Sequence, residues 1–144
     1  MGLNKYTILN NICDGVNSLV VKAKEKKTSK IVAIKIIGDL QNAYYEESIL
    51  KKLNHKNILK IVEFFIYKNK AYMVFEYMDR TLLDLVENNN VLSEENAKII
   101  FKELLNGISY IHNKTIYHKD IKLENILIDN KNNKKICDFG LSEE

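Results

Sequence analysis

Residues 118–140 read HKDIKLENILIDNKNNKKICDFG, and this stretch decides the fold expected for the chain. Within it, two short strand-like runs, NILI and KKIC, stand on either side of a turn rich in asparagine and lysine. Short runs that contain β-branched residues and are bounded by Asn and Asp are typical of strands joined by a turn. The stretch therefore predicts alternating short strands and polar loops.

Helical patterns precede this stretch. The residues TLLDLVENN, which start at Thr81, predict a short helix. Ser93 is a suitable N-cap for a longer helix, because Glu94 and Glu95 follow it and carboxylates favour the positive end of a helix. This second helix is predicted to end near Asn113. Its apolar positions recur at three- and four-residue steps and form a continuous stripe that must pack against other residues: Ala97, Ile100, Phe101, Leu104, Leu105, Ile108 and Ile111.

The first half of the chain predicts a small sheet interrupted by one helix. Its strand-like runs are rich in β-branched and aromatic residues: YTILNNIC, SLVVKAK, KIVAIKII, ILKIVEFFI and KAYMVFEYM. Between the third and fourth runs, residues 40–53 have helical spacing, with Ile49, Leu50 and Leu53 on one face. The pattern predicts a five-stranded antiparallel α+β domain with a single helix.

Composition excludes several other classes of protein. The 46% hydrophobic and 28% charged residues are ordinary for a soluble globular domain. The formal charge is only +3, and Arg80 is the sole arginine, so nucleic acid is not an expected partner. Cys13 and Cys137 have no disulfide or zinc spacing, which favours an intracellular location. No apolar run approaches the roughly 18 residues of a membrane helix, so no membrane association is expected.

Four motifs occur in an order that resembles the eukaryotic protein kinases. They are VAIK at 32–35, Glu46 in the predicted helix, HKDIKLEN at 118–125 and DFG at 138–140. Each motif alone arises by chance in many chains, but the four together at compatible spacings are a specific signal. The resemblance implies a kinase N-lobe at 1–77 and the first part of a helical C-lobe at 78–144. The motifs are most similar to Ser/Thr kinases, and VFEYMDRTLLDL is weakly similar to cyclin-dependent kinases.

The resemblance implies ATP and Mg²⁺ as cofactors, held by residues from both lobes. Lys35 is expected to hold the α- and β-phosphates and to pair with a glutamate of the first helix. Two adjacent glutamates are available, Glu46 and Glu47. Glu46 is favoured because it lies nine residues before His55, the family's usual offset, and shares a face with the apolar residues of the helix.

The catalytic loop of the family implies a role for each polar residue of HKDIKLEN. Asp120 is expected to accept or orient the proton of a substrate hydroxyl, and Lys122 to offset charge on the transferred phosphoryl group. Asn125 and Asp138 are expected to provide oxygen ligands to Mg²⁺. His118 is interpreted as a structural hydrogen-bonding residue under the loop.

The resemblance also implies an adenine site with an apolar lining and a backbone edge between Glu76 and Met78. In addition to Lys35, Glu46 and Asp138, the residues expected to bind the nucleotide are Ile12, Gly15, Val20, Ala33, Phe75, Glu76, Met78 and Leu127.

The sequence departs from the family in its phosphate loop and around Asp120. The loop reads CDGVNSLV in place of GxGxxGxV, so Cys13 and Ser18 replace two glycines. Because glycine permits positive φ and close backbone approach, this change is expected to weaken ATP binding. Lys119 stands where arginine is usual, and Leu123 replaces a common proline.

Only four residues follow DFG, so the family's activation segment and peptide-binding helices are expected to be missing. The long helix would normally lay part of its apolar stripe on those helices. Leaving three such side chains bare costs roughly 5 to 9 kcal/mol, because each buried apolar side chain contributes about 1.5 to 3 kcal/mol. Self-association or a regulatory protein is therefore expected to cover this face of the C-lobe.

Three functions remain open at this point. The first is a protein Ser/Thr kinase that transfers the γ-phosphoryl group of MgATP to a protein hydroxyl. The second is a catalytically weak or dead module that binds ATP or a partner. The third is a small-molecule phosphotransferase of the kinase-like fold, which HKDIKLEN and DFG disfavour.

Overall fold

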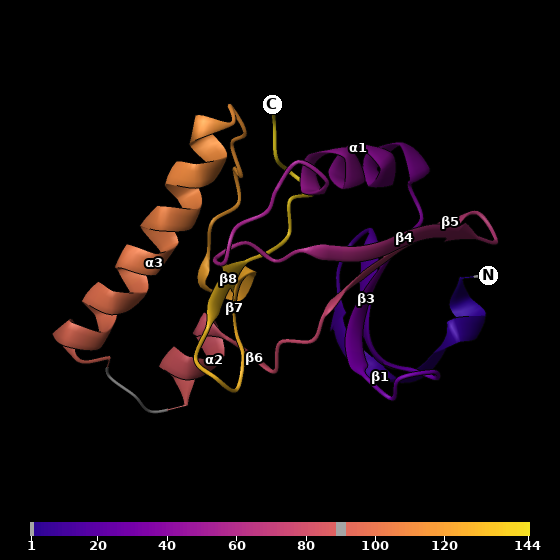
Figure 1. The fold of residues 1–144 in the computed structure, drawn as a ribbon, viewed down its shortest axis with the longest axis horizontal. Coiled ribbons are helices and arrows are strands. Elements are labelled where there is room, and N and C mark those ends of the chain that lie inside the picture. Colours follow the sequence, from indigo (N-terminus) through magenta and orange to yellow (C-terminus); the bar gives the residue numbers. More distant parts are fainter. Residues whose placement is uncertain (1, 89–91) are drawn as a thin grey trace. The chain divides into compact units, whose positions relative to one another are not determined.

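The chain divides into two compact units in a computed structural model that describes residues 2–88 and 92–144 (Figure 1). The first unit comprises Met1–Lys51 and Lys60–Tyr77, and the second comprises Lys52–Leu59 and Met78–Glu144. Residues 52–59 thus belong to the second unit, although elements of the first unit flank them in the sequence.

An antiparallel sheet of five strands with one α-helix forms the first unit. The strand order is β1-β2-β3-β5-β4. The elements are η1 (Leu3–Lys5), β1 (Tyr6–Asp14), β2 (Ser18–Glu25), β3 (Ile31–Ile37), α1 (Leu40–Leu50), β4 (Ile61–Tyr67) and β5 (Lys70–Glu76). The α+β fold class expected from the sequence is confirmed.

Two tight turns shape this sheet. Lys68 and Asn69 have φ angles of 46° and 57° and connect β4 to β5. Two consecutive residues with positive φ make a two-residue type I′ hairpin, whose twist matches that of the strands. Between β1 and β2, the Gly15 amide donates to the Ser18 carbonyl at 2.8 Å, which closes a second short turn.

The two faces of the sheet have different roles, because successive side chains of a strand point to opposite sides. One face buries an apolar cluster: Tyr6, Val21, Ala23, Val32, Ile34, Tyr72 and Val74. The other face carries Lys35 of β3, and α1 lies against β4 and β5. Helix α1 begins after Asp39, whose carboxylate accepts from the Asn42 amide at 3.2 Å.

A polar cluster joins the two edge strands of the sheet. Tyr6 at the start of β1 donates its hydroxyl to Glu63 of β4 at 2.6 Å, and Lys5 pairs with the same carboxylate at 2.5 Å. The Tyr6 ring also stacks on Phe65, which stacks in turn on Tyr72. Since β1 and β4 stand at opposite ends of the strand order, these contacts require the sheet to curl.

The Glu63 carboxylate predicts a measurable loss of stability in acid. Burial alone would raise its pKa, but hydrogen bonds from Lys5 and Tyr6 and the positive charge of Lys5 together lower it. A carboxyl group whose pKa is lower in the folded state stabilises the fold above its unfolded pKa and loses this contribution as pH falls. We expect Glu63→Gln to lower the melting temperature at pH 7. The difference in melting temperature between the variant and the wild type should narrow as pH falls below about 4.5. Thermal unfolding followed by circular dichroism across this pH range measures the gap; a gap that stays constant would contradict the prediction.

The second unit combines two helices with a small sheet of strand order β6-β7-β8. Its elements are β6 (Arg80–Thr81), α2 (Leu82–Glu87), α3 (Glu94–Asn113), η2 (Leu123–Asn125), β7 (Ile126–Ile128) and β8 (Lys134–Ile136). A capping box between Thr81 and Asp84 starts α2. Ser93 caps α3 by accepting from the Asn96 amide at 3.2 Å, so both predicted ends of this helix are confirmed.

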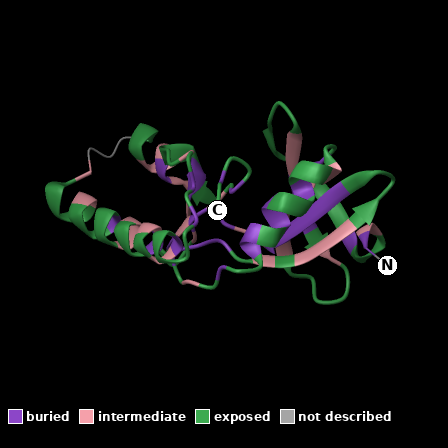
Figure 2. Cartoon of the chain, turned by 90° about the horizontal axis from the view of Figure 1, so that it is seen from above, coloured by how far each residue is buried: buried purple, intermediate pink, exposed green. Residues whose placement is uncertain are grey.

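Helix α3 buries only part of its predicted apolar stripe (Figure 2). Ile100 and Ile111 are buried, and so is Gly107, whose missing side chain lets Ile136 of β8 and Asn57 approach closely. A Cβ atom at residue 107 would lie 3.1 Å from the Ile136 side chain. On the same helix Phe101 is 64% exposed and Leu105 is 51% exposed. The stripe is thus divided into a packed half and an uncovered half.

Residues 52–59 are fastened to β8 by backbone hydrogen bonds. The Ile136 amide donates to the Asn57 carbonyl at 2.8 Å, and the Leu59 amide donates to the Ile136 carbonyl at 2.9 Å. The Asn57 side chain donates to the Lys134 carbonyl at 3.0 Å. Helix α1 ends at Leu50 rather than near Leu53 as predicted, because the chain turns at residues 51–52 into this segment. No helix in the described ranges 2–88 and 92–144 is long and apolar enough to span a bilayer.

Candidate active site

Lys35 and Glu46 form a buried ion pair in the first unit. Lys35 Nζ lies 2.8 Å from Glu46 Oε1 and 2.9 Å from Oε2. The side chains of Lys35 and Glu46 are only 12% and 4% exposed. Glu47 does not share this position, because its carboxylate pairs with Lys51 one helical turn later. Of the two candidate glutamates, the structure therefore brings Glu46 to Lys35.

The strand register places several of the expected nucleotide-binding residues on the Lys35 face of the sheet. Val20 pairs directly with Lys35, and Ala33 pairs directly with Phe75. Because Ala33 and Lys35 are two residues apart on one strand, all four side chains lie on the same face. The unit thus presents an apolar surface beside an ammonium group.

The remaining expected residues of the first unit lie at its periphery. Ile12 is on β1 and is 46% exposed, and Gly15 lies in the turn between β1 and β2. Glu76 ends β5 and is half-buried. Cys13, which replaces a glycine of the family, is exposed and pairs with Val20, directly after a register shift between Asn11 and Cys13. The substituted loop is therefore the turn of a β-hairpin whose first strand is irregular.

In the second unit, Asp120 lies at the centre of a hydrogen-bonded loop. The Asn125 side-chain amide donates to the Asp120 carbonyl at 2.9 Å and to its carboxylate at 3.1 Å. Lys122 Nζ lies 3.4 Å from the same carboxylate. Asn125 is buried, whereas the side chain of Asp120 is 26% exposed and that of Lys122 is 50% exposed. The loop thus fixes a carboxylate that solvent can reach, with an ammonium beside it.

His118 is hydrogen-bonded to the backbone of this loop and of the segment before Asp138. Its Nδ1 accepts from the Asp120 amide at 3.1 Å, and its Nε2 lies 2.8 Å from the Cys137 carbonyl. The arrangement fits the neutral tautomer with a proton on Nε2. Burial lowers the pKa of His118, although the hydrogen bond to Cys137 and the charges of Asp138 and Asp120 oppose the shift. His118 is therefore a buried, neutral residue with a structural hydrogen-bonding role, as interpreted from the sequence.

The DFG segment is anchored next to the same loop. The Cys137 amide donates to the Asn125 carbonyl at 2.9 Å. Because Asp138 directly follows Cys137, this hydrogen bond brings the backbone of Asp138 near Asn125. Asp138 has a φ of 63°, and its carboxylate accepts from the Gly140 amide at 3.2 Å. Phe139 is fully buried, with its ring 4.8 Å from the His118 ring. The segment thus holds an aspartate in an uncommon backbone conformation over a packed phenylalanine.

The donor atoms around Asp138 suit a hard divalent cation. The amide nitrogen of Asn125 is occupied by Asp120, so its oxygen is the atom left to contact a ligand. Among the described residues no cluster of three His, Cys, Asp or Glu side chains forms a complete metal site. Mg²⁺ does not need one, because it is usually held by one or two carboxylates together with water and phosphate oxygens. Asn125 and Asp138 therefore fit a magnesium ion that arrives with a phosphate ligand.

Two further expected residues lie in the second unit. Leu127 is in the middle of β7, where it pairs with Thr81 of β6 and Lys135 of β8. Met78 begins the second of the two segments that make up this unit and is only 8% exposed. Both are apolar residues at or beside the small sheet.

A contact that the sequence did not predict restrains Lys119, the residue before Asp120. Lys119 has a φ of 67°, and its ammonium pairs with Glu143. Glu143 and Tyr117 also exchange backbone hydrogen bonds at 2.8 and 2.9 Å. No motif indicated this pairing, because the two residues are brought together by an isolated bridge rather than by a patterned strand.

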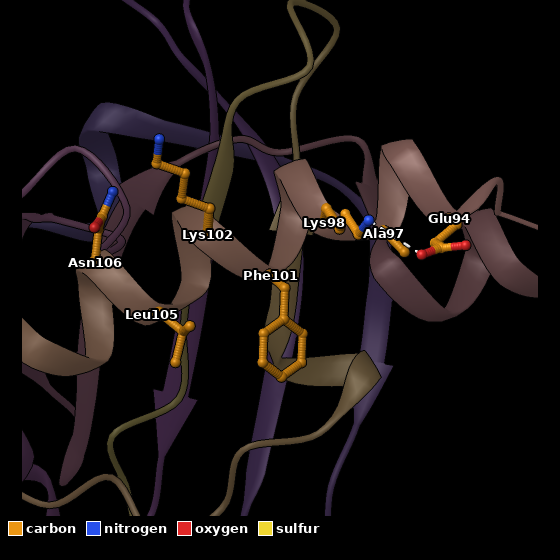
Figure 3. A pocket seen from close by; sticks show the side chains of 7 residues that line it. All are labelled: Glu94, Ala97, Lys98, Phe101, Lys102, Leu105 and Asn106. Carbon is orange, nitrogen blue, oxygen red and sulfur yellow. Dashed lines mark ion pairs between the residues drawn. The ribbon is translucent and has the colours of Figure 1, made fainter.

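A shallow hollow runs along the uncovered side of α3, outside the residues expected to bind nucleotide. Figure 3 shows the side chains of Phe101 and Leu105 projecting in the same direction, with a Glu94–Lys98 ion pair towards the start of the helix. The lining consists of Glu94, Ala97, Lys98, Phe101, Lys102, Leu105 and Asn106. Its apolar floor suits a protein surface better than a phosphate.

Comparison with known proteins agrees with this geometry. The protein kinase domain family matches residues 6–144. A probable serine/threonine-protein kinase KIN1 homolog of Enterocytozoon bieneusi is 35% identical over 97% of this chain and 25% of its own length. Cyclin-dependent kinase 12 of Drosophila melanogaster is 37% identical over 95% of this chain and 13% of its own length. The CTD kinase subunit alpha of Saccharomyces cerevisiae is 37% identical over 96% of this chain and 28% of its own length.

The chain belongs to the protein kinase family, as the resemblance in its motifs predicted. The first two of these relatives are a serine/threonine kinase and a cyclin-dependent kinase, so the similarity falls within the Ser/Thr class. The chain spans about a quarter or less of the first two relatives' lengths.

Proposed function

We propose that this chain forms the nucleotide-binding and catalytic-loop part of a protein Ser/Thr kinase, which transfers the γ-phosphoryl group of MgATP to a protein hydroxyl. The observation that carries the proposal is the loop in which Asn125 and Lys122 both contact the Asp120 carboxylate. The Lys35–Glu46 pair in the other unit supports it. In this proposal residues 1–77 correspond to the N-lobe and residues 78–144 to part of the C-lobe.

Each residue has a role that follows from its charge and surroundings. Lys35, oriented by Glu46, neutralises the α- and β-phosphates. Asp120 accepts the proton of the attacking hydroxyl, and Lys122 offsets negative charge that spreads over the phosphoryl oxygens. Bound Mg²⁺, held by Asn125 and Asp138, would neutralise phosphate charge.

Adenine binding is assigned to the apolar face of the first unit and to one residue of β7. Val20 and Ala33 would cover one side of the base, Leu127 the other, and Phe75 the back of the site. The backbone from Glu76 to Met78 would supply hydrogen bonds to the base edge. Ile12 and Gly15 would contact the nucleotide from β1 and its turn.

A second candidate function is a module that binds ATP or a partner protein without efficient transfer. The substituted phosphate loop favours it: Cys13 is paired with Val20 in the ladder, and the Ser18 carbonyl accepts the Gly15 hydrogen bond in a closed turn. Side chains at these positions leave less room for backbone amides to approach phosphate. The intact Asp120, Asn125 and Asp138 favour the enzyme.

Nucleotide binding can be tested by thermal shift on the full 144-residue chain. MgATP at about 100 times its dissociation constant should add about 2.7 kcal/mol to stability, which raises the melting temperature by several degrees. Lys35→Ala and Asp138→Ala should each abolish the shift, because each removes a charge that binds the triphosphate or its metal. Lys30→Ala is the matched control, because Lys30 is an exposed lysine directly before β3, and this variant should keep the shift. A wild-type chain with no shift would remove both candidate functions.

The uncovered side of α3 is proposed as a protein-binding face of the kinase. Phe101 and Leu105 together expose an apolar surface that a regulatory protein or a second copy would cover. An intracellular setting is also proposed, supported by two cysteines, Cys13 and Cys137, that form no disulfide.

A further inference from the structure

Strand β4 is an open edge of the five-stranded sheet. It stands last in the order β1-β2-β3-β5-β4, and within the described part of the first unit no strand pairs with its outer side. Val62 is 65% exposed and Ile66 is 39% exposed. An open strand edge presents a row of unpaired backbone donors and acceptors and can template another strand.

The hairpin register shows which backbone groups point outward. A two-residue turn makes its flanking residues, Tyr67 and Lys70, a hydrogen-bonded pair. In an antiparallel ladder such pairs alternate with non-bonded ones, so the next position, Ile66, points its amide and carbonyl away from β5. Phe64, two residues earlier, also points its amide and carbonyl away from β5. These two residues therefore offer four backbone groups at the outer edge.

The side chains beside this edge are apolar on one face. Phe64 and Ile66 alternate along β4, and Phe64 meets Tyr44 of α1 with a ring separation of 5.5 Å. The exposed Val62 precedes them, at an irregularity of the ladder between Ile61 and Glu63. Tyr44 is itself 51% exposed. Glu63 does not break the apolar face, because its carboxylate is turned to the opposite face, where Lys5 and Tyr6 bind it.

Exposed lysines flank the edge at both ends. Lys60 precedes β4, and Lys68 follows it in the turn. A second copy paired antiparallel about Phe64 would place Lys60 opposite Lys68 of the other copy, at both ends of the pairing. Like charges directly opposite each other destabilise a strand pair, so self-pairing is disfavoured.

We propose that β4 is a docking edge for an extended segment of another protein, with alternating apolar side chains and acidic residues at both ends. The segment would add a sixth strand by backbone hydrogen bonds to Phe64 and Ile66, as in other cases of strand addition. Its apolar side chains would contact Val62, Phe64 and Tyr44. Its acidic ends would meet Lys60 and Lys68. This inference concerns a surface that takes no part in the proposed phosphoryl transfer and stands independently of it.

Binding of a labelled synthetic peptide to the full chain tests the proposal without nucleotide. The probe alternates valine and threonine and has two aspartates at each end; its partner probe has lysines in their place. The aspartate probe should bind, with an affinity that falls as salt is raised, and the lysine probe should bind at least about tenfold more weakly, because its charges repel those of β4. Val62→Glu should weaken binding of the aspartate probe about tenfold or more, since it replaces an exposed apolar side chain of the edge strand by a carboxylate that repels the probe. The double variant Lys60→Glu, Lys68→Glu should reverse the preference between the two probes.

The matched control is Ile8→Glu on β1, the opposite edge strand, where Ile8 is 47% exposed. It should leave probe binding unchanged. Equal binding of both probes, an equal loss with Ile8→Glu, or no reversal in the double variant would overturn the proposal. The alternative occupant of the edge is a second copy of the chain, and light scattering of the chain alone tests it. If the chain self-associates, Val62→Glu abolishes this association and the aspartate probe does not bind, the edge would be assigned to a second copy.

Discussion

Asp120→Asn is expected to lower the rate of phosphoryl transfer to a protein substrate by about 10²- to 10⁴-fold, the usual contribution of a positioned general base. The amide that replaces the carboxylate cannot take the hydroxyl proton, yet it can still accept the hydrogen bond from Asn125. Transfer of labelled phosphate to a generic basic protein measures the effect. We expect the activity of the wild-type chain alone to be low, so the assay must resolve slow turnover.

Glu124→Gln is the matched control for this experiment, because Glu124 is an exposed acid in the same loop. It should retain the wild-type rate, and both variants should retain the thermal shift with MgATP. A wild-type chain that binds MgATP but transfers no phosphate would favour the binding module over the enzyme. Transfer that survives Asp120→Asn unchanged would exclude Asp120 as the base.

Phe139→Ala is expected to cost about 3 to 5 kcal/mol of unfolding free energy, the range for removing a buried aromatic side chain. Phe139 is fully buried and packs against the ring of His118, so its loss leaves a cavity beside the loop that carries Asp120. Because whole domains are stable by only about 5 to 15 kcal/mol, much of the chain's stability would be lost. Urea unfolding followed by circular dichroism measures the change.

Phe101→Ala is the same chemical change at an exposed site and serves as the control. Phe101 is 64% exposed, so the unfolding free energy should change by no more than about 0.5 kcal/mol. The same variant should reduce any concentration-dependent association through the hollow on α3, which light scattering can detect. Similar costs for the two variants would mean that burial of Phe139 is not what stabilises the DFG segment.

Local patterns in the sequence were enough to predict most of the helices and strands. The start of α3 followed from Ser93 and the two glutamates after it, and the strands of the first unit followed from runs of β-branched residues. The choice of Glu46 over Glu47 needed the family offset as well as the helix face. Both residues are buried on α1, so burial alone would not have separated them.

Contacts between distant residues could not be predicted in the same way. Tyr6 and Glu63 are 57 positions apart, and Asn57 and Lys134 are 77 positions apart. Neither pair belongs to a motif, and side-chain periodicity carries no information about which distant element a residue meets. The sequence predicted that part of the apolar stripe of α3 is exposed, but not which residues are exposed. Periodicity shows which residues share a face and does not show which of them pack against another element. The assignment of each residue to ATP or magnesium remains a prediction.

Residues 52–59 belong to the second unit, and this limits how the protein can be divided into fragments. The polypeptide passes between its two units at 51–52, 59–60 and 77–78, so no single cut yields two complete halves. A fragment ending at Tyr77 would carry Asn57 and Leu59 away from the β8 carbonyls and amides that they bind. A fragment starting at Met78 would leave β8 without its parallel neighbour at Ile58. Folding of the two units is therefore expected to be interdependent, and expression of either half alone should give a less ordered product than the intact chain.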